Sequence, residues 1–212
     1  WMDSPFKSKK EFNFARFHQV STDEVYGSID TGSFSEKSQY LPNSPYSASK
    51  ASADMLVRSY NKTFGLNTTI SISSNNYGKN QHKEKFIPKI IDSIIKNKDI
   101  VVYGNGLNIR NWIFVSDNCE AIDSIFNNSI SGKSYNVASQ NEFTNLELVN
   151  IIHAIINKKQ KVNKKIHFID DRHGHDFRYS IDINEIKKDL KWKPISNFLS
   201  SLELVIDNYI IK

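Results

Sequence analysis

Cysteine is almost absent from this sequence: the 212 residues include one, Cys119. A single thiol excludes an intrachain disulfide and a cysteine-based zinc site, and it fits the reducing cytoplasm. No uninterrupted apolar run approaches the roughly 18 residues that a transmembrane helix needs. Residues 1–5 lack the basic and then apolar pattern of a secretory signal. We therefore expect a cytoplasmic protein with no membrane partner.

The charge is moderately positive, with 28 Lys and Arg against 23 Asp and Glu. The lysines are scattered along the chain, whereas nucleic-acid binding needs a concentrated basic face. We expect no nucleic-acid partner, although single basic residues remain available for substrate phosphates. The hydrophobic fraction of 39% is ordinary for a globular protein with a buried core.

Helices are predicted from start signals, stop signals and apolar spacing. Ser44 followed by Pro45 is a typical helix start, and Gly65 ends the segment, which predicts a helix over residues 45–64. Thr144 and Glu147 have the spacing of a capping box. Three later stretches repeat apolar residues at the helical spacing of three and four. They are residues 87–95, 148–156 and 202–210.

Short runs rich in β-branched and aromatic residues separate these helices and predict strands. They are residues 17–21, 68–71, 100–103, 112–115, 135–137 and 166–169. Strands that alternate with helices favour an α/β protein with a mostly parallel sheet.

A polar cluster with catalytic potential, residues 21–27 (STDEVYG), directly follows the first predicted strand. Ligands of open α/β sheets bind beyond the carboxyl ends of the strands, so this cluster is placed to face a site. When two carboxyls are neighbours, as Asp23 and Glu24 are, their pKa values can be pushed apart. One carboxyl then stays protonated as an acid, and the other is ionised as a base. A polar turn explains the same residues equally well.

A second cluster opens the helix that follows. Tyr46 and Lys50 are four residues apart and therefore share one face of that helix. We expect the ammonium group to lower the pKa of the phenol and to make it a usable base. The pair alone is weak evidence, because many surface helices contain this spacing by chance.

Together and in this order, the clusters resemble the active site of the extended short-chain dehydrogenases/reductases. Within that group, the motif STDEVYG is similar to the corresponding motif of the dTDP-glucose 4,6-dehydratase family. Related epimerases and decarboxylases usually lack the acidic pair, and GDP-mannose dehydratases generally carry another residue at position 23. The resemblance implies a partial Rossmann-like parallel sheet in residues 1–75, which carry the catalytic residues of the NAD-binding domain. Residues 76–212 would mainly form a smaller sugar-nucleotide subdomain, with some segments returning to the first part.

The resemblance extends through five later motifs, which cover residues 74–78, 84–88, 101–104, 109–112 and 171–176. It implies cofactor contacts from Ser21, Tyr46, Lys50 and Asn76. It implies substrate contacts from Thr22, Asn75, Lys85, Phe86, Val101, Tyr103, Arg110, Asn145, Arg172 and His175. Arginine suits the phosphates because its planar fork donates paired hydrogen bonds.

Each of these residues also has a plainer explanation, such as a surface ion pair for Arg110. His173 and His175 have no third ligand nearby, so we predict no metal site. Lys79, Asn111 and His173 stand where the family usually has Pro, Asp and Pro, which bears on substrate fit.

The resemblance implies a mechanism in three steps. Tyr46 takes the proton of the sugar 4-hydroxyl while NAD accepts hydride from C4, with Lys50 on the nicotinamide ribose and Thr22 on the reacting oxygen. Glu24 then removes the C5 proton, and Asp23 protonates the departing 6-hydroxyl. Hydride returns to C6, and the product is a 4-keto-6-deoxy sugar nucleotide.

The family opens with a glycine-rich NAD-binding loop, and this sequence contains no such run. About 100 residues, or three strand–helix units, would be missing. We therefore expect a truncated dTDP-glucose dehydratase that is inactive alone. The alternatives are a non-catalytic, sugar-nucleotide-binding remnant, a separate polypeptide that supplies the missing part, or another extended sugar-nucleotide dehydratase, epimerase or decarboxylase. A homodimer or self-association is expected, since intact relatives usually pair through the helix that carries Tyr46 and open sheet edges associate.

Overall fold

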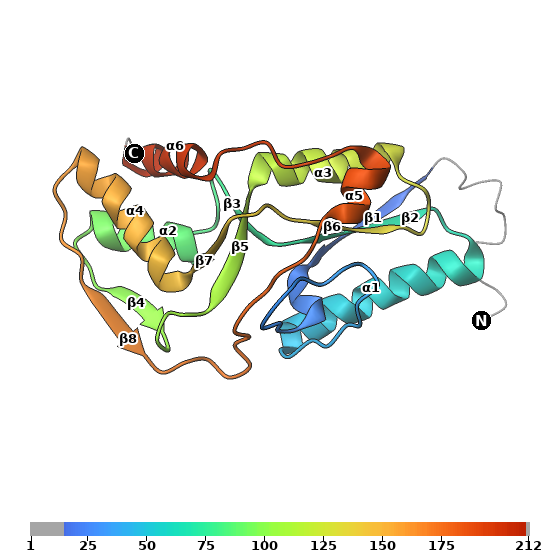
Figure 1. The fold of residues 1–212 in the computed structure, drawn as a ribbon, viewed down its shortest axis with the longest axis horizontal. Helices are drawn as coiled ribbons and strands as arrows, with labels where there is room; N and C mark the ends of the chain where they lie inside the picture. Colours follow the sequence, from blue (N-terminus) through green and yellow to red (C-terminus); the bar gives the residue numbers. More distant parts are fainter. Residues whose placement is uncertain (1–14, 211–212) are drawn as a thin grey trace.

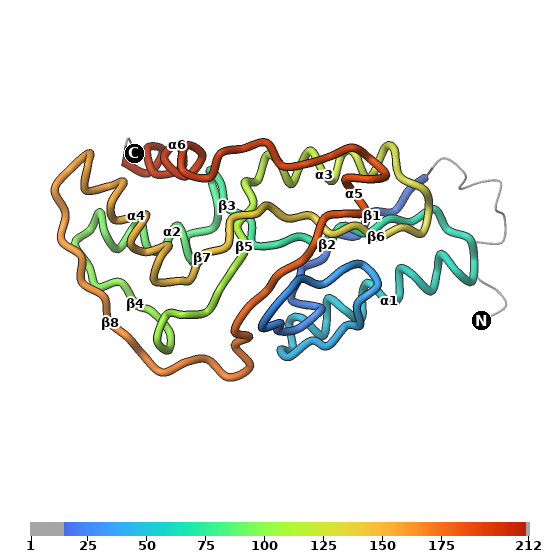
Figure 2. Tube along the Cα trace, viewed as in Figure 1, coloured from blue at the N-terminus to red at the C-terminus, as the bar shows by residue number. Residues whose placement is uncertain are grey.

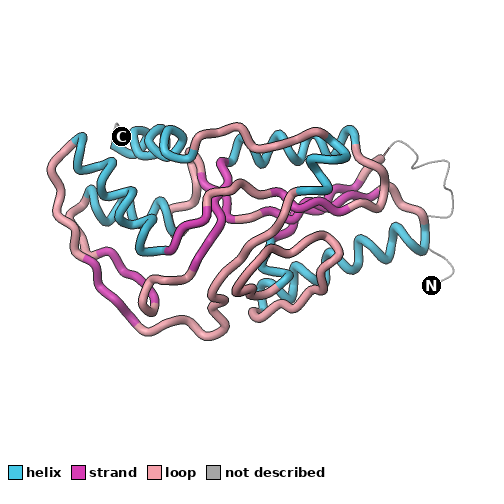
Figure 3. The backbone as a smooth tube through the Cα atoms, in the orientation of Figure 1, coloured by secondary structure: helices cyan, strands magenta, loops and turns pink. Residues whose placement is uncertain are grey.

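The computed structural model describes residues 15–210, which form two halves side by side (Figure 1). One half contains a parallel sheet in the order β1-β2-β6. Its strands are β1 (Phe17–Thr22), β2 (Thr68–Ser73) and β6 (Ser134–Val137). The sheet lies between α1 (Pro45–Phe64) on one face and α3 (Val115–Asn128) with α5 (Asn184–Leu190) on the other (Figure 3). All six residues of β2, the middle strand, are consequently buried.

The other half contains two smaller sheets. In the first, β3 (Asn75–Tyr77) pairs parallel with β5 (Ile109–Phe114), which pairs antiparallel with β7 (Glu142–Thr144). In the second, β4 (Ile100–Tyr103) pairs parallel with β8 (Ile166–Ile169). The helices of this half are α2 (Phe86–Ile95), α4 (Asn145–Lys159) and α6 (Phe198–Ile210).

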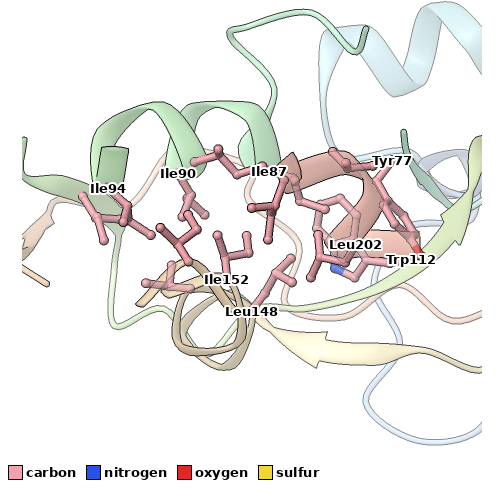
Figure 4. Close-up of a cluster of buried hydrophobic side chains, with 14 of the residues drawn as sticks. Tyr77, Ile87, Ile90, Ile94, Trp112, Leu148, Ile152 and Leu202 are labelled. Atoms are coloured by element: carbon pink, nitrogen blue, oxygen red, sulfur yellow. The ribbon is translucent and has the colours of Figure 1, made fainter. Parts of the chain in front are cut away.

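The apolar stripes of these three helices meet in one core (Figure 4). Ile87, Ile90 and Ile94 project from α2 toward Leu148 and Ile152 of α4. Leu202 closes this core from α6, beside Tyr77 and Trp112. The predicted spacing of three and four is therefore the spacing that is buried.

The chain crosses between the halves more than once. After β8 it returns past the loop of residues 27–44 to reach α5 (Figure 2). Arg178 fixes this returning segment by three hydrogen bonds. Its Nε and Nη2 donate to the two carboxylate oxygens of Glu142 at 3.0 and 3.1 Å, and its Nη1 donates to the Gly32 carbonyl at 2.9 Å. Ile181, Ile183 and Ile186 then join the core of the first half.

The predicted α/β class is confirmed, as are the helices over residues 45–64, 87–95, 148–156 and 202–210. Ser44 caps α1, Gly65 follows it in the left-handed region at φ 67°, and Thr144 and Glu147 form the predicted capping box. The prediction of a strand over residues 112–115 is wrong at both ends. β5 begins at Ile109, and Val115 already starts α3.

Four elements escaped the sequence patterns for identifiable reasons. α3 follows β5 directly, and Phe114 offers no side-chain cap that would mark its start. α5 is seven residues long, and β3 and β7 have three residues each. Such short elements carry too little periodicity to be recognised.

Leu148→Ala should lower the free energy of unfolding by about 2–5 kcal/mol, because the side chain is fully buried and its removal leaves a cavity. Leu199→Ala, at a position that is 56% exposed, is the matched control and should change it by less than about 1 kcal/mol. Urea unfolding of both variants measures the difference, and equal midpoints would contradict the observed core.

Candidate active site

The first predicted cluster lies where β1 ends and the short helix η1 (Asp23–Tyr26) begins. Side chains alternate along a strand, so Ser21 and Thr22 point to opposite sides. Thr22 caps η1: its Oγ1 accepts from the Glu24 amide at 3.4 Å and lies 3.4 Å from Glu24 Oε1. Gly27 ends the turn at φ +83°, where an added Cβ would lie 2.4 Å from the Leu41 carbonyl oxygen. Only glycine fits that position without strain.

The structure places Ser21 away from the position predicted for it. Its Oγ donates to Asp54 Oδ2 of α1 at 2.5 Å, in the interior. The alternation of the strand causes this, since the neighbouring Thr22 takes the side of the catalytic carboxyls. The geometry therefore gives Ser21 a hydrogen bond to α1, and its contact with the cofactor stays a prediction.

The two carboxyls have unequal surroundings. Asp23 is 2% exposed, and burial followed by the nearby Glu24 raises its pKa to about 8. Burial also raises the pKa of Glu24, but the Thr22 hydrogen bond, Arg110 and Lys85 oppose that rise. At neutral pH Asp23 is therefore protonated, as an acid must be, beside a second carboxyl that is better placed to ionise.

Tyr46 lies near this pair, in the first turn of α1, and is 56% exposed. Burial, then Glu24 and Asp23, raise the pKa of its phenol. The prediction that Lys50 lowers this pKa is wrong for this arrangement. The Lys50 Nζ donates to the Val20 carbonyl at 2.6 Å, while the carboxyls of η1 act on the phenol.

Arg110 is buried beside the carboxyl pair. Its Nη1 donates to the carbonyls of Ile109 and Phe177 at 2.7 and 3.1 Å, and its Nη2 donates to that of Asp176 at 2.8 Å. Its guanidinium also lies 4.2 Å from the centre of the Tyr179 ring. This positive charge lowers the pKa of both Asp23 and Glu24 and thus opposes the effect of burial.

The sequence patterns missed Asp176 as part of this site. Its Oδ1 accepts from Asn43 Nδ2 at 2.6 Å, and its Oδ2 accepts from the Tyr179 hydroxyl at 2.9 Å. Its charge raises the pKa of Glu24. Asp176 ends the late motif at residues 171–176, and that membership was the signal available to find it.

A second cluster forms where β4 and β8 end side by side. The Arg172 guanidinium lies 5.0 Å from the centre of the Tyr103 ring, a cation–π arrangement. His175 Nδ1 lies 2.6 Å from Asp171 Oδ1, and burial lowers the pKa of this histidine. Val101 lies earlier on β4, paired with His167.

The remaining predicted residues have different surroundings. Lys85 precedes α2, and its charge lowers the pKa of Glu24, so it belongs with the carboxyl pair. Phe86 stacks on Trp112 with ring centres 6.1 Å apart. Asn145 begins α4, and its backbone N–H donates to the backbone carbonyl of Asn108 at 3.0 Å.

Asn75 and Asn76 lie on β3 rather than in a turn, opposite Trp112 and Ile113 of β5. Asn76 Nδ2 donates to the Ser74 carbonyl at 3.1 Å. Its Oδ1 is buried and has no hydrogen-bond partner among the described residues. Buried acceptors are normally paired, so this one fits a donor supplied by a ligand.

Two kinds of feature are missing from residues 15–210. No three His, Cys, Asp or Glu side chains gather there as a metal ion would require. No helix in that range combines the length and the apolar character needed to cross a membrane.

The raised pKa of Asp23 predicts a pH-dependent stability. Between the usual Asp pKa of 3.8 and about 8, the folded chain holds a proton here that the unfolded chain has lost. The contribution of this group to the free energy of unfolding therefore falls as pH rises through that window. Asp23→Asn should remove that fall and be the more stable protein at pH 8 but not at pH 4. Urea unfolding across pH 4–9 tests this, with the exposed Asp30→Asn as control; parallel curves for all three proteins would contradict it.

Comparison with known proteins agrees with these motifs. A family model described as GDP-mannose 4,6 dehydratase matches residues 6–204. A dTDP-glucose 4,6-dehydratase from Neisseria gonorrhoeae is 40% identical over 99% of this chain, which covers 63% of that relative. One from Xanthomonas campestris pv. campestris is 42% identical over 92% of this chain and 58% of its own length. The chain thus spans about three-fifths of these curated relatives.

Solved structures agree as well. The dTDP-glucose 4,6-dehydratase DesIV from Streptomyces venezuelae, with NAD and TYD bound, superposes with a TM-score of 0.88 at 37% identity. That match covers 93% of this chain and 60% of DesIV. The Bacillus anthracis dTDP-glucose 4,6-dehydratase in complex with NAD gives 0.89 at 40% identity, over 96% and 64% of the two chains. This chain therefore belongs to the GDP-mannose 4,6 dehydratase family and, within it, is most usefully compared with dTDP-glucose 4,6-dehydratases.

Proposed function

We propose that this chain carries the catalytic and sugar-binding part of an NAD-dependent dTDP-glucose 4,6-dehydratase. The observation that supports this most directly is the burial of Asp23 beside Glu24 and near Tyr46, which raises the Asp23 pKa to about 8 and favours its protonated form. Elimination of water needs an acid and a base at adjacent carbons, and an epimerase needs no such pair. The product is dTDP-4-keto-6-deoxyglucose, a precursor of deoxysugars such as rhamnose and of cell-surface polysaccharides.

The residues present fit one end of NAD. Tyr46, Lys50 and Asn76 would hold the nicotinamide end, where the unpaired Asn76 Oδ1 fits an amide donor. NAD, when bound, accepts hydride from C4 and returns it to C6. The described residues contain no glycine-rich turn from a strand to a helix, so they do not provide the usual cradle for the NAD diphosphate.

The side chains of this chain would move three protons. Tyr46 in its deprotonated form removes the proton of the 4-hydroxyl; burial, then Glu24 and Asp23, disfavour that form of the phenol in the chain by itself. Glu24 removes the C5 proton, which the C4 ketone has made acidic, and gives a proton back to C5 when hydride is added at C6. Asp23 gives its proton to the 6-hydroxyl, and that oxygen leaves as water.

We place the nucleotide at the second cluster. There the exposed Arg172 offers a positive charge, and the half-buried Tyr103 offers an aromatic face. Arg172 would meet the diphosphate, and Arg110 is proposed as a further phosphate contact. Thr22, Asn75, Lys85, Phe86, Val101, Asn145 and His175 complete the proposed substrate contacts.

The wider organisation is proposed on the same basis. Residues 1–75 belong to the NAD-binding part, and residues 76–212 mainly form the substrate subdomain, with the segments around α3, β6 and α5 returning to the first part. The protein works in the cytoplasm as a homodimer or self-associating chain. Exposed Met55, Leu56 and Tyr60 on α1 support an apolar contact at that helix.

A binding fragment without activity of its own is the second candidate, and the lack of a glycine-rich turn within the described residues favours it. Incubated alone with NAD and dTDP-glucose, the chain should form no 4-keto product, because the NAD diphosphate lacks its usual site. Detection of that product by its absorbance in alkali would overturn this expectation.

In the complete, NAD-loaded enzyme, in which the NAD-binding part is also present, Glu24→Gln should abolish exchange of the C5 proton with deuterated solvent, because the amide cannot act as a base. NMR of the sugar nucleotide recovered from deuterium oxide measures the exchange. Glu120→Gln, on the exposed face of α3, is the control and should exchange normally. Normal exchange in Glu24→Gln would refute the role given to this residue.

Binding can be tested without turnover. Arg172→Ala should weaken the affinity for dTDP by about 10-fold, the loss expected for one charge-assisted contact. Lys187→Ala, on exposed α5, is the control and should leave the affinity unchanged. Calorimetric titration gives both values; equal affinities would remove Arg172 from the site.

A further inference from the structure

A buried carboxyl that the mechanism does not use lies behind the active site. Asp54 is 0% exposed, and it lies on α1 at the same spacing of four that separates Tyr46 from Lys50. These three residues therefore follow one another along one face of the helix. The catalytic helix thus presents a third polar group to the sheet, one turn beyond Lys50.

One oxygen of Asp54 makes all of its hydrogen bonds to other side chains. Oδ2 accepts from Ser21 Oγ at 2.5 Å and from the Tyr40 hydroxyl at 3.2 Å, whereas Oδ1 has no partner among the described residues. Arg58 Nη2 donates to the Tyr40 hydroxyl at 2.8 Å, and the positive charge of Arg58 lowers the pKa of Asp54. Burial raises the pKa of the Asp54 carboxyl.

A carboxyl in such surroundings is a costly choice for packing alone. Its desolvation is only partly offset by the Ser21 and Tyr40 hydroxyls, by Gln19 and by the Arg58 charge, since burial remains the largest influence on its pKa. An apolar side chain of similar shape would be cheaper to bury. What an apolar side chain lacks is direction. A short hydrogen bond fixes both the distance and the rotation of the groups that it joins.

The groups joined here are the two catalytic segments. Ser21 is the residue before Thr22, so its position sets where Thr22, Asp23 and Glu24 begin. Asp54 belongs to the helix that carries Tyr46 and Lys50. Tyr40 adds the loop that leads into this helix. Lys50 makes a parallel link, since its Nζ donates to the carbonyl of Val20 on the same strand.

We propose that Asp54 is a positioning residue: through Ser21 it holds the end of β1 against α1 and so sets the separation between Tyr46 and the Asp23–Glu24 pair. This inference rests on the proposed function for its catalytic consequence, but the contact itself can be tested without turnover.

The readout without turnover is the titration of Tyr46. Burial raises the pKa of its phenol most, and Glu24 and Asp23 raise it further by an amount that depends on their separation from the phenol. The full chain is labelled with ¹³Cζ-tyrosine, and Tyr46→Phe assigns the signal. Ser21→Ala removes the bond and leaves the charge of Asp54 in place. It should move the Tyr46 pKa back toward its ordinary value, and Asp54→Ala should do the same.

Three comparisons separate this effect from general loosening. Asp54→Asn keeps an acceptor oxygen for Ser21 and should titrate like the wild type. The double variant Ser21→Ala with Asp54→Ala should shift no further than the larger single shift, since both remove one contact. Ser52→Ala, an exposed hydroxyl on α1, is the control and should have no effect.

The catalytic readout uses the complete, NAD-loaded enzyme and dTDP-glucose deuterated at C4. Ser21→Ala should lower kcat by on the order of 10- to 100-fold, raise the isotope effect and leave KM nearly unchanged, because a misplaced base slows hydride transfer rather than binding. A merely structural role would reduce the folded fraction in urea and leave the isotope effect alone.

The outcomes are distinct. If the complete, NAD-loaded enzyme with the wild-type residues shows no turnover, the proposed function fails, and the Tyr46 titration of this chain still decides the role of Asp54. If Ser21→Ala and Asp54→Ala both fold and titrate like the wild type at Tyr46, the positioning role is overturned. Asp54→Ala is not needed for that decision if it fails to fold, because Ser21→Ala is the smaller change.

Discussion

The burial of the Asp23 carboxyl is the constraint around which the site is arranged. Taking this group out of water disfavours its charged form, and the turn that buries it also brings Glu24 alongside. Gly27 makes the turn possible, because a side chain there would collide with the Leu41 carbonyl. The acid of the proposed reaction is therefore a product of backbone geometry as much as of residue type.

Arg110 limits how far this effect goes. Its guanidinium is held by three backbone carbonyls and the Tyr179 ring, so its charge is fixed in place beside the carboxyls. Fixed charges act without the reorganisation that water would require. Asp176, on the returning segment, accepts hydrogen bonds from Asn43 and Tyr179 and so helps to hold the Tyr179 ring that packs against Arg110.

Much of the fold follows from local signals in the sequence. Ser44, Pro45 and Gly65 mark both ends of α1, and the apolar spacing after Ile87 and Leu148 marks α2 and α4. α3 could not be found this way, because it starts at Val115 without a cap. The division into three small sheets also depends on pairings between distant segments, which no local pattern reveals.

The sequence predicted which residues lie close together in the candidate site better than it predicted their pKa values. The order of the motifs identified Thr22, Asp23, Glu24 and Tyr46 as candidates for the same site. The helical spacing of Lys50 could not show that its ammonium would bind the Val20 carbonyl, and so the expected pKa of Tyr46 had the wrong direction. The buried contact of Asp54 with Ser21 joins residues 33 positions apart and was likewise hidden.

The return of the chain past the loop of residues 27–44 has a consequence for folding. Arg110, Asp176 and Tyr179 reach the carboxyl pair from more than 80 residues away, since Asp23 and Arg110 are themselves that far apart in the sequence. Contacts between such distant segments form late, because closing a long loop costs conformational entropy before it is repaid. During synthesis the turn of residues 22–27 therefore emerges well before the segment that completes its surroundings, and until then Asp23 remains an ordinary acidic side chain in water.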